Sequence, residues 1–171
     1  GIANHLSIIK THPSWEPTSE ISMIKTVNSA TARTSLSFLG LSWRMDPESD
    51  YFCGLHWRAG KHSIVRDIRT RGGWAQPKDE GTAHTQIRIT GNGGGKWYGV
   101  GRSQNIRANH PEFHLFVIER THQPLIFYNL NPERVHYVPY ETGKRMENLE
   151  SSGWQMEILH SENIAIYGLK S

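Results

Sequence analysis

The residues with the clearest chemical potential form a cluster of cations in the middle of the chain. Ten of the nineteen Lys and Arg residues lie between Arg58 and Arg107, a stretch that holds only three acidic residues. This stretch carries a charge of +7 in a chain whose net charge is +3, so the remaining residues carry −4. Because Lys and Arg neutralise phosphates, the asymmetry favours a surface that binds a polyanion such as DNA.

Two polar segments carry the side chains that commonly contact nucleic acids. Residues 25–35 (KTVNSATARTS) contain seven small or hydroxylated side chains between two apolar runs. Residues 86–96 combine Gln, Arg, Thr, Asn and Lys side chains with the beginning of the glycine-rich stretch from Gly91 to Gly101. Arg reads guanine bidentately, whereas Asn and Gln read adenine, so both segments are candidates for base contacts.

Several catalytic and metal-binding patterns are absent from the sequence. The glycines of residues 91–96 (GNGGGK) do not form a nucleotide-binding loop, because Thr90 and Trp97 stand where that motif needs Gly and Ser or Thr. None of the ten histidines is followed by a lysine two positions later, and no HExxH pattern occurs. Glu112 and Glu119 are possible carboxylates for glycoside hydrolysis, but their odd spacing on one strand would place them on opposite faces. We therefore predict no metal, no cofactor and no catalytic residue.

The composition indicates one globular domain. The chain has 171 residues, of which 36% are hydrophobic, and it shows neither an internal repeat nor a low-complexity run. Its single cysteine, Cys53, excludes an internal disulfide and fits a reducing compartment, so we predict a cytoplasmic location. No apolar run is long enough to cross a membrane. Because the sequence begins at Gly1, we expect a fragment of a larger protein.

Short apolar runs separated by turn residues predict a protein made mainly of strands. The expected strands are residues 19–27, 36–43, 51–57, 62–69, 85–90, 113–119, 124–130, 154–160 and 163–168. We expect residues 120–123 to close a hairpin and residues 142–152 to form a short helix, whereas residues 2–10 fit either state. Because strands and helices do not alternate, the predicted fold is all-β with one or two short helices, an open antiparallel pseudobarrel.

Two segments resemble the DNA-recognition pseudobarrel of EcoRII-type and BfiI-type restriction endonucleases, a fold shared with plant transcription factors. Met23 to Thr34 is similar to the N-arm of that family, a lysine followed by a loop rich in Asn and Thr. Gln86 to Asn92 looks like its C-arm, an Arg-Ile-Thr strand end before a glycine-rich turn. The Thr-Gly and His-Gln elements of the EcoRII-type N-arm are replaced here by residues 32–35 (ARTS). The resemblance implies a seven-stranded pseudobarrel whose two arms grip the major groove, while a separate nuclease domain cleaves.

The combined prediction is a domain that binds double-stranded DNA sequence-specifically within a restriction endonuclease. The expected base-reading residues are Asn28, Ser29, Thr31, Arg33, Gln86, Arg88, Thr90 and Asn92. The expected phosphate-binding residues are Lys25, Arg58, Lys61, Arg66, Arg69 and Lys96. Two alternatives stay open: a hydrolase that uses His and Glu residues, and a carbohydrate- or protein-binding β module that exposes its tryptophans on a flat face.

Overall fold

The described part of the chain is built from strands that form two parallel sheets. The computed structural model describes residues 7–10, 22–42, 53–71, 85–101, 116–131 and 156–169, and these contain no helix. Sheet A has the strand order β1-β3-β5-β7-β9-β11, and sheet B has the order β10-β8-β6-β4-β2. The strands are β1 (Ile8–Lys10), β2 (Ser22–Lys25), β3 (Ser35–Ser42), β4 (Cys53–Trp57), β5 (Ile64–Arg71), β6 (Thr85–Thr90), β7 (Gly95–Tyr98), β8 (Phe116–Glu119), β9 (Leu125–Tyr128), β10 (Met156–Leu159) and β11 (Ile164–Tyr167).

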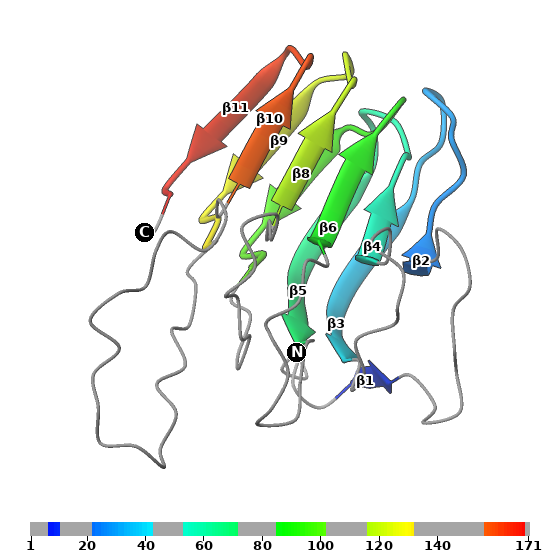
Figure 1. The fold of residues 1–171 in the computed structure, drawn as a ribbon, viewed down its shortest axis with the longest axis vertical. Helices are drawn as coiled ribbons and strands as arrows, with labels where there is room; N and C mark the ends of the chain where they lie inside the picture. The colour runs from blue at the N-terminus through cyan, green and yellow to red at the C-terminus, as the bar shows by residue number, and fades with distance from the viewer. Residues whose placement is uncertain are drawn as a thin grey trace, which may run out of the picture.

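Successive strands from β2 onward alternate between the two sheets, so the chain winds as a solenoid with two strands in each coil. Five coils follow one another: β2–β3, β4–β5, β6–β7, β8–β9 and β10–β11. Figure 1 shows the strands of sheet B pointing up and β11 of sheet A pointing down, with the short connections at the top. In sheet B, equivalent positions pair from coil to coil in the series Ile24, Leu55, Ile87, Phe116 and Met156.

The predicted antiparallel pseudobarrel is wrong, because every pairing between the described strands is parallel. The hairpin expected at residues 120–123 shows why. The apolar runs on either side are indeed strands, but β8 belongs to sheet B and β9 to sheet A. The short connection therefore turns the chain from one layer to the other, and each strand pairs with its counterpart in the neighbouring coils. The expected helix at residues 142–152 lies outside the described residues.

All nine predicted strand segments contain an observed strand, and the structure adds β1 and β7. β7 was missed because it begins inside the glycine-rich stretch, which resembles a loop in the sequence. The coils are a structural repeat that the sequence did not reveal, because the paired positions listed above are 29 to 40 residues apart and carry different apolar side chains. In solenoids of this kind each unit packs only on its neighbours, so repeated geometry does not need repeated sequence.

Left-handed backbone conformations recur at one corner of the coils. Asp67, Gly99, Asn129 and Gly168 follow one another in register at this corner and have φ values of 50°, 58°, 54° and 70°. The φ angle of Phe38 in the first coil is 57°. Only Gly adopts this conformation freely, and Asn and Asp tolerate it best among the other residues, which explains four of the five residue types.

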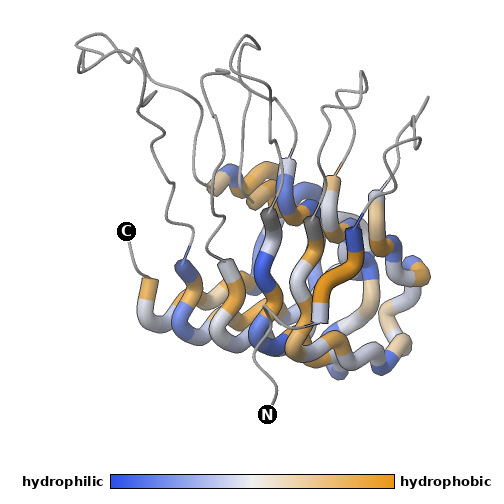
Figure 2. The backbone as a smooth tube through the Cα atoms, turned by 90° about the horizontal axis from the view of Figure 1, so that it is seen from below, coloured by the Kyte–Doolittle hydropathy of each residue, from blue (hydrophilic) through white to orange (hydrophobic). Residues whose placement is uncertain are grey.

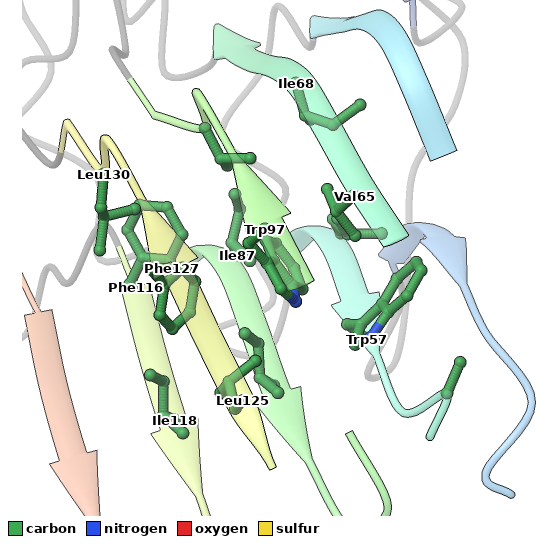
Figure 3. Close-up of a cluster of buried hydrophobic side chains, with 14 of the residues drawn as sticks. Trp57, Val65, Ile68, Ile87, Trp97, Phe116, Ile118, Leu125, Phe127 and Leu130 are labelled. Carbon is green, nitrogen blue, oxygen red and sulfur yellow. The ribbon is translucent and has the colours of Figure 1, made fainter. Parts of the chain in front are cut away.

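The core lies between the two sheets and runs through the solenoid. The side chains drawn in Figure 3 come from both sheets and point toward one another, with Trp57, Trp97, Phe116 and Phe127 as the largest. The two tryptophan rings meet edge to face with centroids 5.4 Å apart, and Trp97 packs on Phe127 at 5.5 Å. Along the backbone, hydrophobic positions recur in the successive coils (Figure 2). Burial of these aromatic side chains therefore supplies much of the driving force that stacks the coils.

Two findings bear on the wider function classes. Within the described ranges, no helix is long and apolar enough to span a membrane. In the same part of the chain, no group of three or more His, Cys, Asp or Glu side chains is placed to hold a metal ion.

Candidate functional site

The outer face of sheet B carries a row of polar side chains that crosses the strands. Lys25 pairs with His56, His56 with Arg88, Arg88 with Val117, and Val117 with Glu157. The core residues Leu55 and Trp57 flank His56, and Ile87 and Ile89 flank Arg88. Because side chains alternate along a strand, His56 and Arg88 point away from the core. We call the described polar positions of this face the sheet-B row: Lys25, His56, Arg58, Gln86, Arg88 and Thr90.

Hydrogen bonds order one side of the sheet-B row. His56 Nε2 lies 2.8 Å from Thr90 Oγ1, which connects β4 to the end of β6. Arg58 directly follows β4, and its backbone N–H donates to Thr26 Oγ1 at 2.6 Å. These contacts hold the backbone of three adjacent coils in register around the cationic side chains.

Several polar atoms of the sheet-B row are buried without a hydrogen-bond partner. Gln86 has 0% of its surface exposed, and neither its Oε1 nor its Nε2 has a partner. The Nε atoms of Arg58 and Arg88 are also buried without a partner, although both residues are only half-buried. A buried polar group left unpaired costs about 1–3 kcal/mol. Native proteins contain few such groups, and a cluster of them on one face is typical of a surface that completes its hydrogen bonds with a ligand.

Charge is distributed unevenly over this face. At the described outward positions of β2, β4 and β6, and at Arg58, the chain places three cations and a histidine but no acidic side chain. The acids lie on the following strands, Glu119 at the end of β8 and Glu157 on β10. Glu119 forms an ion pair with Arg120 at 3.1 Å. The part of the sheet-B row formed by the first three coils therefore has a positive potential that favours an anionic ligand.

A second group of predicted site residues lies on the short turns between the sheets. Asn28 Oδ1 accepts hydrogen bonds from Asn92 N at 3.0 Å and from Asn92 Nδ2 at 3.1 Å. Ser29 and Thr31 share a hydrogen bond of 3.1 Å between their hydroxyl groups. The exposed side chains of Arg33 and Lys61 belong to the turns of the first and second coils. The two asparagines thus connect the turns of the first and third coils.

Asn28→Ala is expected to lower the free energy of unfolding by about 0.5–1.5 kcal/mol, because it removes the acceptor of both hydrogen bonds from Asn92. Urea denaturation followed by circular dichroism measures the change. Arg33→Ala is the matched control, since it shortens an exposed side chain of the same turn and should change stability by less than about 0.5 kcal/mol. Equal stability of Asn28→Ala and the wild type would show that this contact does not hold the turns together.

The third group lies on sheet A, on the opposite side of the core. Arg66, Arg69 and Lys96 belong to β5 and β7. The Arg66 guanidinium lies 5.3 Å from the centroid of the Tyr98 ring. Tyr98, Tyr128 and Tyr167 stack in register, with centroids 5.0 and 5.5 Å apart. Because the rings cover one another, this tyrosine ladder stabilises the stacked coils, and its only uncovered ring face is that of Tyr167.

Tryptophans do not form an exposed platform in the described part of the chain. Trp57 and Trp97 are buried, and the indole N–H groups of both donate to the carbonyl oxygen of Gly94 at 3.0 and 3.4 Å. The other four tryptophans lie outside the described residues. The same contacts show that the glycine-rich stretch is a packed turn of the core, where the Thr121 hydroxyl also donates to the carbonyl oxygen of Gly93.

The predicted site residues therefore fall into three places, and sequence reasoning missed one residue of the first. Lys25, Arg58, Gln86, Arg88 and Thr90 come together on the sheet-B row, whereas the turn residues and the sheet-A residues lie elsewhere. The segments interpreted as two arms are equivalent parts of the first and third coils, a sheet-B strand followed by its turn. His56 was missed among ten histidines, although its position between two large apolar residues on a predicted strand indicates an outward-facing side chain.

Comparisons with protein-family models, with curated proteins and with solved structures gave no match for this chain.

Proposed function

We propose that this protein binds a linear acidic polysaccharide along the outer face of sheet B. The observation that carries the proposal is the sheet-B row itself, where Lys25, His56 and Arg88 occupy paired positions on three adjacent parallel strands. Adjacent strands lie about 4.8 Å apart, so the row follows the axis of the solenoid with one position in each coil. Such an array is suited to a chain of repeating anionic units.

Burial of the sheet-B row supports a thin ligand. His56 is only 5% exposed and Gln86 is 0% exposed, so these side chains do not project from the surface. A side chain that reads duplex DNA must reach base edges at the bottom of a major groove about 8.5 Å deep. A single polysaccharide chain presents its carboxylates and hydroxyls at its own surface, and it does not require projecting side chains.

Sequence-specific binding of duplex DNA is a second proposal, supported by a different surface. Arg33, Lys61 and Arg120 are exposed on the turns of the first, second and fourth coils, and 74% of the Arg120 side chain is accessible. Exposed cations along one edge can contact phosphates without entering a groove. A restriction-endonuclease parent with a separate nuclease domain and a cytoplasmic location both stay predictions.

The test of the proposed function is affinity electrophoresis of the purified chain in native gels that contain polygalacturonate, alginate or a neutral galactan. We expect retardation in at least one polyuronate gel and none in the neutral gel, with the retardation decreasing as salt screens the charges. Unchanged mobility in both polyuronate gels would contradict the proposal. Fluorescence anisotropy with a labelled duplex tests DNA binding in parallel, and release of reducing ends from the polymers tests the hydrolase alternative.

Variants assign the binding to one face of the solenoid. Lys25→Gln removes a cation of the sheet-B row and should weaken polyuronate retardation, because Lys25 is exposed and pairs with His56. Arg66→Gln is the matched control, since it removes an exposed cation from sheet A on the opposite side of the core. If Arg66→Gln weakens the retardation and Lys25→Gln does not, the ligand binds sheet A and the proposed face is wrong.

A further inference from the structure

We propose that Gln86 and Arg88 form a subsite for one uronic acid unit, in which Arg88 binds the carboxylate and Gln86 binds an adjacent hydroxyl. This inference rests on the proposed function and adds the chemical identity of the sugar unit. Both residues belong to β6, two positions apart, so their side chains leave the same face of the sheet about 6.6 Å from each other. Each has at least one buried polar atom without a partner.

The neighbours of Arg88 leave its charge without a registered carboxylate. On β4 the paired residue is His56, whose Nε2 contacts Thr90, and on β8 the paired residue is Val117. Arg88 is half-buried, and its Nε is buried without a partner. A guanidinium group in this setting is completed by a planar carboxylate, which accepts two parallel hydrogen bonds from it.

Gln86 determines what must accompany the carboxylate. Its Oε1 needs a donor and its Nε2 needs an acceptor, and both atoms are unpaired. The position level with Gln86 on β4 is Gly54, which has no side chain that could supply either group. A hydroxyl both donates and accepts, so a hydroxyl beside a carboxylate satisfies Gln86 and Arg88 together.

This combination of groups discriminates among polymers. A phosphodiester only accepts hydrogen bonds, so it would leave Gln86 Oε1 unpaired, and a neutral sugar would leave the Arg88 charge without a counter-ion. A uronic acid unit carries hydroxyls and a carboxylate on one ring, and therefore supplies all the missing partners.

The test is isothermal titration calorimetry with the uronate oligosaccharide that the gels select, galacturonate or alginate, and with its methyl ester. The ester keeps the ring and the hydroxyls but removes the negative charge. We expect the wild type to bind the free acid at least about tenfold more tightly than the ester. Arg88→Gln should weaken binding of the acid about 10- to 100-fold, because hydrogen bonds to a charged group are lost, and should leave binding of the ester within about twofold.

Gln86→Leu separates recognition from folding. It should weaken binding of the acid and the ester alike, by about tenfold, because the hydroxyl loses its partner in both. Its thermal midpoint should equal or exceed that of the wild type, because the substitution removes two unpaired buried atoms. A lower midpoint would show that Gln86 has a structural role and would overturn the subsite.

The outcomes distinguish this inference from the proposed function. If the wild-type chain binds neither polyuronate, the proposed function fails first and the subsite fails with it. If the wild type binds a polyuronate but Arg88→Gln keeps the same preference for acid over ester, the proposed function stands and the subsite is wrong.

Discussion

Replacing Trp97 with alanine is expected to lower the free energy of unfolding by about 3–5 kcal/mol. The Trp97 side chain is only 1% exposed and packs against Trp57 and Phe127 with ring centroids 5.4 and 5.5 Å away. Alanine would leave a cavity between the two sheets and remove two aromatic contacts, each worth about 0.5–1.5 kcal/mol beyond the area that it buries. Guanidinium denaturation followed by circular dichroism measures the loss.

The matched control for Trp97→Ala is Tyr167→Ala in the terminal coil. Tyr167 is also aromatic and stacks on Tyr128, but it is 58% exposed and one face of its ring is uncovered. Its replacement should cost less than about 1.5 kcal/mol. If the two variants unfold at the same denaturant concentration, the aromatic core between the sheets does not dominate stability.

Gly95→Ala is expected to cost about 3 kcal/mol, because its backbone conformation and its surroundings both exclude a side chain. The φ angle of Gly95 is 100°, which L residues rarely adopt, and an added Cβ would lie 2.4 Å from the carbonyl oxygen of Ser63. That oxygen accepts the hydrogen bond from Lys96 N at 3.0 Å, so it cannot move without disturbing the pairing between β5 and β7. The shift of the urea midpoint measures the effect.

Gly99→Asn is the control that separates the conformation from the clash. Gly99 has a φ of 58°, and the equivalent residues of the neighbouring coils are Asp67 and Asn129. An added Cβ at Gly99 would meet only the side chain of Asp67, which can rotate away. We expect a change of less than about 1 kcal/mol, because Asn tolerates left-handed φ angles better than most residues. A loss as large as that of Gly95→Ala would mean that any side chain at this corner disrupts the coils.

The proposed sheet-B row was only partly predictable. Arg58, Gln86, Arg88 and Lys25 were recognised from residue type, because Arg, Lys and Gln clustered near strands suggest contacts with a polyanion. The same reasoning placed Asn28 and Asn92 among base-reading residues, and the structure shows that these two side chains hydrogen-bond to each other. Sequence gives no distance between residues 64 positions apart, so it could not distinguish a ligand contact from a contact between two turns.

The local alternation of apolar and polar residues determined which segments are strands, and it did so even for short ones such as β9 and β11. It also indicated outward side chains such as Arg88 between Ile87 and Ile89. Alternation carries no information about which strand lies beside which, because parallel and antiparallel neighbours bury the same face. Only the tertiary structure decided that β8 and β9 lie in different sheets and that Lys25, His56 and Arg88 share one row. The physical reason is that the pairing is set by the packing of large core residues such as Trp57 and Trp97 across the two sheets, an interaction between coils that no single segment of the sequence specifies.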